Sequence, residues 1–399
     1  MKKNIINYVN EFSFTFEQEP LNEVDSLVFC QLSYLKLEKV FRASLLKTIT
    51  LEQLNNLHEE SVWSVRKPEL NKKLLEAVGE SVRFKDVSIS NYVSLTEDVE
   101  DKQFSATTYA LNDIAYVAFR GTDATVVGWK EDFNIISNET IPSQLEAVKY
   151  LNEVAPSLPV NFYIGGHSKG GNLAVFASVN CDKSVQNRLI YVFNNDGPGL
   201  RKEMAETPKY ISVKDRIITI VPESSLFGVL LQNDDYLTIV SNGFWLMQHD
   251  PFNWAIHDGC FEYKSKITGN AKRLADSLNE WFYTADEAQK DAFVNTLNMI
   301  LTATGEDSFK KIALNYKKNL PIILDKIKNI NAETSENITE ALKIFGKLVF
   351  ESLKPDVTSI THKFIQVKAK LNEVKNPLSS LKDKVGKTNK LPNGNNLKE

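Results

Sequence analysis

Residues 162–177 of the chain read FYIGGHSKGGNLAVFA. The first three residues are aromatic or β-branched, as in a buried strand, and residues 171–177 have the composition of a helix. Between these two segments lies a G-x-S-x-G pentapeptide, residues 166–170. A strand, a tight turn and a helix in this order expose the central serine, Ser168, at the edge of an α/β sheet.

This turn favours Ser168 as a nucleophile. A serine at such a turn has a strained backbone, and small residues two positions before and after it, Gly166 and Gly170, keep strand and helix from colliding. The amino end of the helix places a partial positive charge beside the oxygen that becomes negative during acyl transfer. We expect the backbone N–H of Lys169 to supply one donor of an oxyanion hole.

A second oxyanion donor is expected in the loop after an earlier strand. The β-prone run 114–119 is followed by Arg120, Gly121 and Thr122. Gly121 lets the chain turn sharply, and Thr122 offers both its N–H and its hydroxyl. We therefore expect Thr122 to provide the second donor.

A serine nucleophile needs a general base, and the chain has five histidines. Three are set aside: His58 in an N-terminal helical part, His167, whose side chain should point away from the Ser168 hydroxyl, and His362 in a lysine-rich end. His249 and His257 remain, in the place where the serine–acid–histidine chain order of α/β-hydrolases puts the base. We prefer His249 because it lies in a loop close behind the predicted strand 236–240.

Two carboxylates could orient that histidine. The active site of a parallel sheet lies beyond the carboxyl ends of its strands. Glu223 follows the predicted strand 217–221, and Asp196 follows the predicted strand 189–194. We prefer Glu223 as the acid and keep Asp196 as the alternative, because Asp196 also fits an ordinary turn, Asn195-Asp196-Gly197-Pro198.

The middle of the chain alternates between predicted strands and helices. The β-prone runs are 103–109, 114–120, 160–164, 189–194, 217–221 and 236–240. The first two form a predicted hairpin around Asn112 and Asp113. Alternation of this kind predicts the α/β class, with a mostly parallel sheet and helices on both faces.

We divide the chain into four parts. Residues 1–80 are predicted to form an N-terminal helical segment, and residues 81–265 the α/β core. Residues 266–386 are predicted to be a helical C-terminal region, and residues 387–399 have the composition of a disordered basic tail.

Local signals support the helical parts. Asn22, with Asp25 three residues on, has the pattern of a helix cap. In the C-terminal region, residues 284–287 resemble a capping box that opens a helix reaching Ala303, and a second apolar face runs through 339–353. The end of the chain is basic, since residues 361–399 hold nine lysines against three acidic residues.

Composition excludes several classes of protein. Hydrophobic residues make up 42% and charged residues 25%, which excludes wholesale disorder. The formal net charge of −4 does not indicate a nucleic-acid partner. The three cysteines are far apart and show no C-x-x-C spacing, and no apolar stretch suits a signal peptide or a membrane-spanning helix. We expect a cytoplasmic protein.

Several separate segments resemble class 3 lipases of the α/β-hydrolase superfamily: Val117–Thr122, Trp129–Asp132 and the turn Gly166–Gly170. An uncharacterised bacterial branch of lipase-like hydrolases is similar in further segments: Asn22–Val28, Gln31–Tyr34, Gln103–Ala106, Pro222–Ser225 and Gln248–Phe252. The resemblance spans roughly residues 20 to 260. It implies an α/β-hydrolase-like fold, with Ser168 as nucleophile, Thr122 as oxyanion residue and His249 as base.

The same resemblance implies structural roles for Trp129 and Asp132. The chain departs from the class 3 lipase pattern at the acid, because class 3 lipases place an Asp just before a Val-Pro after the corresponding strand. Here Val221 and Pro222 come first and Glu223 follows.

These features predict a serine hydrolase that cleaves carboxylic esters, thioesters included, through an acyl-enzyme on Ser168. The alternative is a catalytically inactive α/β-hydrolase scaffold that binds a partner or a ligand. No cofactor motif is present, and acyl transfer by serine needs no metal.

The expected substrate is a small-molecule ester or a lipid. The C-terminal helices and basic end suggest peripheral contact with an anionic membrane. The sequence carries no signal for the oligomeric state.

Overall fold

The computed structural model describes residues 2–290, except for gaps at 45–46, 60–61, 63–66, 98–101, 123–133, 136–139, 226, 232–234, 244 and 287, and also residues 318, 319 and 322. The chain divides into two compact units, residues 1–346 and 347–399. All of the described residues belong to the first unit.

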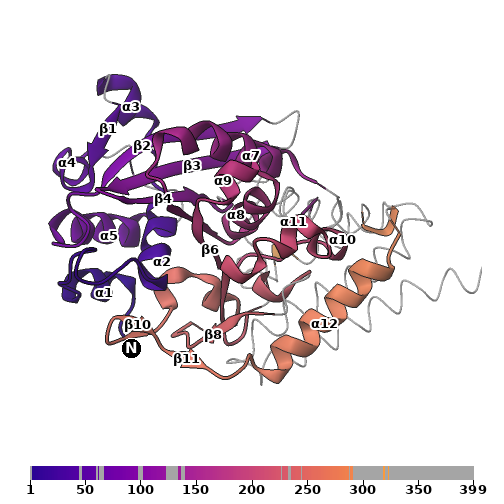
Figure 1. Cartoon of the computed structure of the whole chain (residues 1–399). Helices are drawn as coiled ribbons and strands as arrows, with labels where there is room; N and C mark the ends of the chain where they lie inside the picture. Colours follow the sequence, from indigo (N-terminus) through magenta and orange to yellow (C-terminus); the bar gives the residue numbers. More distant parts are fainter. Residues whose placement is uncertain are drawn as a thin grey trace, which may run out of the picture. The chain divides into compact units, whose positions relative to one another are not determined.

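Among the described residues, a nine-stranded mixed sheet forms the centre of this unit (Figure 1), in the order β1-β2-β3-β4-β5-β6-β7-β8-β11. The strands are β1 (Thr48–Thr50), β2 (Ser88–Glu97), β3 (Lys102–Leu111), β4 (Ile114–Phe119), β5 (Phe162–His167), β6 (Leu189–Asn195), β7 (Ile217–Pro222), β8 (Leu237–Ile239) and β11 (Tyr263–Lys264). Neighbouring strands from β4 to β8 are parallel. The strands at both edges pair antiparallel. Strands β9 (Ile256–His257) and β10 (Cys260–Phe261) form a separate antiparallel pair.

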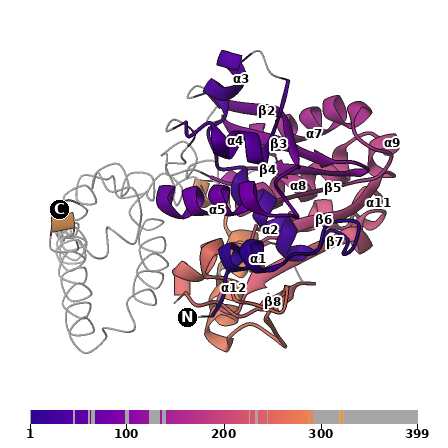
Figure 2. The same ribbon diagram turned by 90° about the vertical axis from the view of Figure 1, so that its left-hand side faces the viewer.

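The helices in the described part are α1 (Ile5–Glu11), α2 (Glu23–Leu32), α3 (Glu38–Ser44), α4 (Leu51–Asn56), α5 (Pro68–Glu80), α7 (Pro142–Val154), α8 (Lys169–Asn180), α9 (Lys183–Gln186), α10 (Lys202–Ala205), α11 (Pro208–Ile211) and α12 (Gly269–Thr284). Figures 1 and 2 show α1, α2 and α5 on one face of the sheet, and α7 and α8 on the other. The predicted α/β class is therefore confirmed.

Strand β4 shows why the sheet is covered on both faces. Successive side chains of a strand point to opposite faces. Val117 and Phe119 pack into the core formed with α7 and α8. Tyr116 and Ala118 pack into the core formed with α1, α2 and α5. A central strand that is apolar on both faces needs a helical layer on each side.

The predicted strands and the predicted hairpin are present, with the β3–β4 turn at Asn112 and Asp113. Strands β1, β2 and β11 were not predicted. Strands β1 and β11 have three and two residues, too few for a periodic pattern to show. With β2 and the hairpin, they make both edges of the sheet antiparallel.

The predicted cap of α2 is also present. The Asn22 side chain accepts hydrogen bonds from the N–H groups of Val24 and Asp25 at 2.9 and 3.0 Å. The Asp25 carboxylate in turn accepts from the Asn22 N–H at 2.9 Å. The cap therefore fixes the Asp25 carboxylate at the start of the helix.

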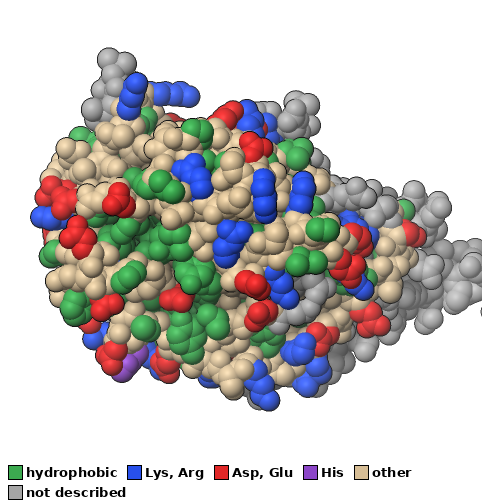
Figure 3. All heavy atoms as spheres, in the orientation of Figure 1, with side chains coloured by type: hydrophobic (Ala, Val, Ile, Leu, Met, Phe, Trp, Pro, Cys, Tyr) green, Lys and Arg blue, Asp and Glu red, His purple; other side chains and the backbone are tan. Residues whose placement is uncertain are grey.

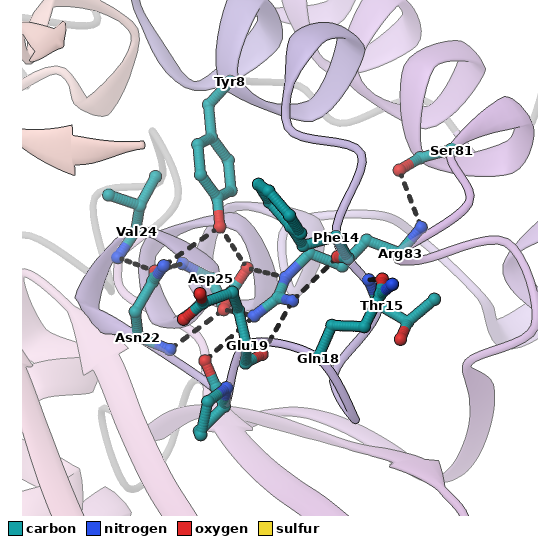
Figure 4. A network of polar contacts seen from close by, with 11 residues as sticks. Tyr8, Phe14, Thr15, Gln18, Glu19, Asn22, Val24, Asp25, Ser81 and Arg83 are labelled. Carbon is teal, nitrogen blue, oxygen red and sulfur yellow. Dashed lines mark hydrogen bonds and ion pairs between the residues drawn. The ribbon is translucent and has the colours of Figure 1, made fainter. Parts of the chain in front are cut away.

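A buried ion pair joins α2 to the segment after α5 (Figure 4). The Nε and Nη2 atoms of Arg83 donate to the Asp25 carboxylate at 2.8 and 2.5 Å, and both side chains are fully buried. The Tyr8 hydroxyl donates to the same carboxylate at 2.8 Å. The guanidinium also donates to three backbone carbonyls: those of Phe14, Glu19 and Pro20. One arginine thus ties the first 25 residues to the rest of the unit.

Part of the sheet face beside α2 is open to solvent. Tyr191 in β6, Leu237 in β8 and Tyr263 in β11 are 42%, 43% and 45% exposed. Leu237 and Tyr263 share the face of the α2 core, because their partners Ile220 and Ile239 belong to it. Figure 3 shows hydrophobic side chains gathered in the region where Figure 1 labels α2 and β11.

Most of the C-terminal predictions fall outside the described residues, including the helix over 339–353 and the tail 387–399. The cap expected at Thr284 for the helix 284–303 was placed two residues too early. Thr284 ends α12, which was not predicted, and the reciprocal capping hydrogen bonds join Asp286 and Gln289. Within the described part of the chain, no helix has the length and apolar character needed to span a bilayer.

Candidate active site

The turn between β5 and α8 has the geometry predicted for it. Ser168 lies between the last residue of β5 and the first residue of α8, with φ 59° and ψ −131°. This backbone conformation is strained for a residue with a side chain. A methyl group on Gly166 would come within 2.1 Å of the Gly170 backbone. Glycine is therefore required where strand and helix meet.

The side chain of His249 lies between those of Ser168 and Asp196. The Nε2 atom of His249 is 2.9 Å from the Ser168 hydroxyl oxygen, and its Nδ1 atom is 2.7 Å from Oδ2 of Asp196. Each residue comes from a loop at the carboxyl end of the parallel strands: after β5, after β6 and after β8. An alcohol, an imidazole and a carboxylate in this order can activate the alcohol as a nucleophile.

Asp196 is fully buried, and its backbone is left-handed with φ 55°. Its Oδ1 atom accepts hydrogen bonds from the Ser225 hydroxyl and, at 3.2 Å, from the Gly228 N–H. Burial raises the pKa of Asp196 to about 8, although these two hydrogen bonds lower it. The carboxylate is thus held rigidly, with Oδ2 directed at the imidazole.

The preference for Glu223 over Asp196 needs correction. Glu223 follows β7 at the expected edge of the sheet, but its carboxylate pairs with Lys264 of β11. Its backbone is also fixed there, since its carbonyl accepts from the Thr268 N–H at 2.6 Å. The carboxylate that meets the imidazole is that of Asp196, the alternative. The turn expected at Asp196 is present, and it directs the Asp196 side chain inward.

The other candidate base, His257, lies away from this group. Its side chain is 77% exposed, and its Nδ1 atom is 3.1 Å from the neighbouring Asp258. Within the described part of the chain, His257 makes no hydrogen bond or ion pair with Ser168 or Asp196. Its position matches that of a surface histidine.

The Lys169 amide directly follows the serine, and the residue before Thr122 contacts it. The Lys169 N–H is the first of α8, where helix amides have no partner within the helix. A methyl group on Gly121 would come within 3.3 Å of the Ser168 Cβ, so the segment that leads to Thr122 touches the serine. Thr122 itself is buried. The Lys169 ammonium points elsewhere and donates to the Gln103 carbonyl at 2.8 Å.

Two rings lie next to the imidazole of His249. The ring of Phe227 lies 4.7 Å from it and the ring of His167 lies 4.6 Å from it, measured between centroids. Phe227 belongs to the apolar segment that follows the Ser225 loop. The imidazole of His249 therefore contacts both a nonpolar ring and a second imidazole.

His167 and Tyr34 were not predicted to take part in this site. The Nε2 atom of His167 is 2.8 Å from the His249 backbone carbonyl oxygen, and its Nδ1 atom is 3.2 Å from the Tyr34 hydroxyl. His167 is directed toward the backbone of the candidate base. For Tyr34, the available signal was the similarity of the segment Gln31–Tyr34 to the bacterial branch of lipase-like hydrolases.

No group of three or more histidine, cysteine or acidic side chains within the described residues could hold a metal ion. Trp129 and Asp132, for which the resemblance implied structural roles, lie outside the described residues.

A family model described as Mbeg1-like matches residues 78–299, more than half of the chain. The chain belongs to the Mbeg1-like family. The matched range of this Mbeg1-like chain contains Thr122, Ser168, Asp196 and His249, and leaves Tyr34 outside it. No curated protein sequence matches the chain significantly.

Several solved structures are similar to this Mbeg1-like chain. A mutant of MDLA from Penicillium cyclopium is 13% identical, with a TM-score of 0.33, over 61% of this chain and 84% of that one. M37 lipase is 15% identical, with a TM-score of 0.33, over 52% and 70%. A Rhizomucor miehei lipase in a propeptide complex is 14% identical, with a TM-score of 0.30, over 59% and 68%.

Proposed function

We propose that this Mbeg1-like chain is a serine hydrolase that cleaves carboxylic esters, thioesters included, through an acyl-enzyme on Ser168. The observation that carries the proposal is the continuous array from the Ser168 hydroxyl through His249 to Asp196, with contacts of 2.9 and 2.7 Å. The class 3 lipase resemblance of the sequence, with its bacterial branch, supports the same assignment.

The reaction begins when the Ser168 oxygen attacks the acyl carbon and its proton passes to Nε2 of His249. The Asp196 carboxylate accepts the Nδ1–H and stabilises the imidazolium that forms. The N–H groups of Lys169 and Thr122 stabilise the negative oxygen of the tetrahedral intermediate.

The second half of the reaction releases the products. The imidazolium returns its proton to the leaving alcohol or thiol as the bond to the acyl carbon breaks. A water molecule then attacks the acyl-enzyme, with His249 again accepting a proton, and the carboxylic acid leaves as Ser168 regains its hydrogen. No step requires a metal or an organic cofactor.

One observation supports a substrate with an apolar acyl group. The Phe227 ring lies 4.7 Å from the His249 imidazole, measured between centroids, and offers a nonpolar contact close to the reacting atoms. We propose an ester or lipid of this kind as the substrate and the cytoplasm as the compartment.

A panel of p-nitrophenyl esters with acyl chains of graded length tests this proposal. We expect hydrolysis by the wild type, a dependence of kcat/KM on chain length, and loss of turnover in Ser168→Ala. Equal rates for the wild type and Ser168→Ala would contradict it. Ester hydrolysis that depends on Ser168 would exclude the alternative, a catalytically inactive scaffold that binds a partner or a ligand.

A further inference from the structure

One segment of the N-terminal part comes close to the reacting residues. Tyr34 follows α2, and only 3% of it is exposed. A methyl group on Gly121 would come within 2.3 Å of the Tyr34 hydroxyl and within 2.4 Å of the His167 carbonyl oxygen. The hydroxyl therefore lies at the junction of the Thr122 loop and the turn that carries Ser168.

The hydrogen bonds of His167 determine where its proton lies. A backbone carbonyl can only accept, so the His167 Nε2 atom carries a hydrogen and donates it to the His249 carbonyl at 2.8 Å. In a neutral imidazole the other nitrogen is then an acceptor. The Tyr34 hydroxyl, 3.2 Å away, donates to it. The chain of donors runs from Tyr34 through His167 to the backbone of His249.

We propose that Tyr34 and His167 are positioning residues for His249: they fix the backbone of the base so that its Nε2 atom stays within hydrogen-bond distance of the Ser168 hydroxyl. This inference rests on the proposed function. It gives the N-terminal segment a positioning role in the reaction, although that segment lies before the strands that carry the site.

The base needs such support because its own segment has little regular structure. His249 ends a short 3-10 helix, Trp245–His249, and precedes another, Pro251–Asn253. The neighbouring residue Gln248 is held by the Trp254 indole N–H, which donates to its carbonyl at 2.8 Å, and by the Ser224 N–H. His167 holds His249 itself. A displacement of the base by about 1 Å can reduce the rate by about 10²-fold.

The N-terminal segment reaches the same loop at other points. The Asn4 side chain donates to the Phe252 carbonyl at 3.0 Å, and the Ile256 N–H donates to the Lys3 carbonyl at 2.9 Å. These contacts brace the chain beyond the base, whereas the His167 contact acts at the base. Loss of the Asn4 contact alone should therefore matter less.

The contact between the imidazoles of His167 and His249 favours a neutral His167 during the reaction. The centroids of the two rings are 4.6 Å apart. When His249 accepts the serine proton it becomes positively charged. A neutral His167 adds no like charge beside it, and a hydroxyl donor from Tyr34 holds that neutral tautomer in place.

Two amide substitutions of His167 test the role of its N–H donor independently of the size of its ring. The amide nitrogen of His167→Gln falls near the position of Nε2, whereas that of His167→Asn falls near Nδ1. We expect His167→Gln to keep kcat within about 3-fold of the wild type and His167→Asn to lower it about 30-fold at little change in KM. Rates are measured on the best ester of the panel, with the melting temperature of each variant as a check on folding.

Tyr34→Phe provides the second arm, and it removes a single oxygen atom. We expect about a 3-fold loss of kcat in the wild-type background and no further loss in the His167→Gln background, where no Nδ1 atom remains. Tyr150→Phe is the matched control. This substitution in α7 also deletes a buried hydroxyl, which donates to the Asn91 carbonyl at 2.7 Å. It should leave kcat unchanged.

The outcomes distinguish this inference from the function on which it rests. Equal kcat values for folded His167→Gln and His167→Asn, or an additive effect of Tyr34→Phe in the double variant, would overturn the positioning role while Ser168-dependent turnover stands. If His167→Asn does not fold, the Tyr34→Phe cycle decides alone. A wild type that turns over no ester and does not react at Ser168 would overturn both.

Discussion

The Oδ2 atom of Asp196 lies 2.7 Å from the Nδ1 atom of His249, across a separation of 53 residues in the chain. Strand β6 lies next to β5 in the sheet, so the loop after β6, which holds Asp196, runs beside the turn that carries Ser168. The left-handed backbone of Asp196 then turns its carboxylate toward the imidazole.

Removing the negative charge of Asp196 should reduce catalysis much more than removing that of Glu223. Asp196→Asn leaves an amide that cannot stabilise the imidazolium, so we expect kcat to fall about 10³-fold or more. Glu223→Gln breaks only the contact with Lys264 and should change kcat by less than about 3-fold. Steady-state ester hydrolysis measures both, and a larger loss in Glu223→Gln would reverse the assignment of the acid.

The raised pKa of Asp196 predicts a rise of activity with pH. Burial brings this pKa from 3.8 to about 8, and the active pair needs the ionised carboxylate. The kcat/KM value should therefore increase as the pH rises through about 8. A profile that is flat between pH 6 and pH 9, roughly one unit or more on either side, would contradict this assignment.

The same shift predicts how the stability of the fold depends on pH. Between 3.8 and about 8 the native state keeps a proton on Asp196 that the unfolded chain has released. The contribution of this group to the free energy of unfolding is thus largest below pH 3.8 and is lost as the pH rises to about 8. Urea unfolding at several pH values should show a smaller dependence on pH in Asp196→Asn.

Gly166→Ala should destabilise the turn around the serine. The added methyl group would lie 2.1 Å from the Gly170 backbone, and we expect a loss of about 2 kcal/mol or more together with loss of ester hydrolysis. Gly269→Ala in α12 is the control, since its methyl group would meet its nearest atom at 3.7 Å. Chemical denaturation should show Gly269→Ala unchanged or more stable.

The buried pair of Asp25 and Arg83 should contribute to stability rather than to the chemistry. Arg83→Met leaves the buried Asp25 carboxylate without its positive partner and three backbone carbonyls without the guanidinium donor, so we expect a loss of about 3–5 kcal/mol. Urea unfolding measures the loss. A variant as stable as the wild type would show that the network in Figure 4 does not hold the N-terminal segment.

Much of the fold followed from local patterns in the sequence. The run before Ser168 predicted β5, the glycines predicted the turn, and Asn112 with Asp113 predicted the β3–β4 hairpin. These features depend on residues close together in the chain, whose periodicity and turn preferences are visible directly. The short edge strands β1 and β11 depend on partners far away, and no local signal marks them.

The choice of the acid also depended on residues that are distant in the chain. The sequence placed both Asp196 and Glu223 at the carboxyl edge of the sheet, but not the direction of their side chains. Glu223 is drawn to Lys264 on the unpredicted strand β11. His167 was missed for a similar reason, because its partners Tyr34 and His249 lie 133 and 82 residues away.

The claim that Ser168 is the nucleophile is tested most directly by covalent labelling. The folded wild type is treated with a fluorophosphonate probe at pH 8 or slightly above, near the pKa of about 8 of Asp196, and the modified peptide is identified by mass spectrometry. We expect one adduct, on Ser168, with slower labelling in Asp196→Asn and none in Ser168→Ala. Absence of labelling in the folded wild type, or equal labelling of Ser168→Ala, would contradict the account.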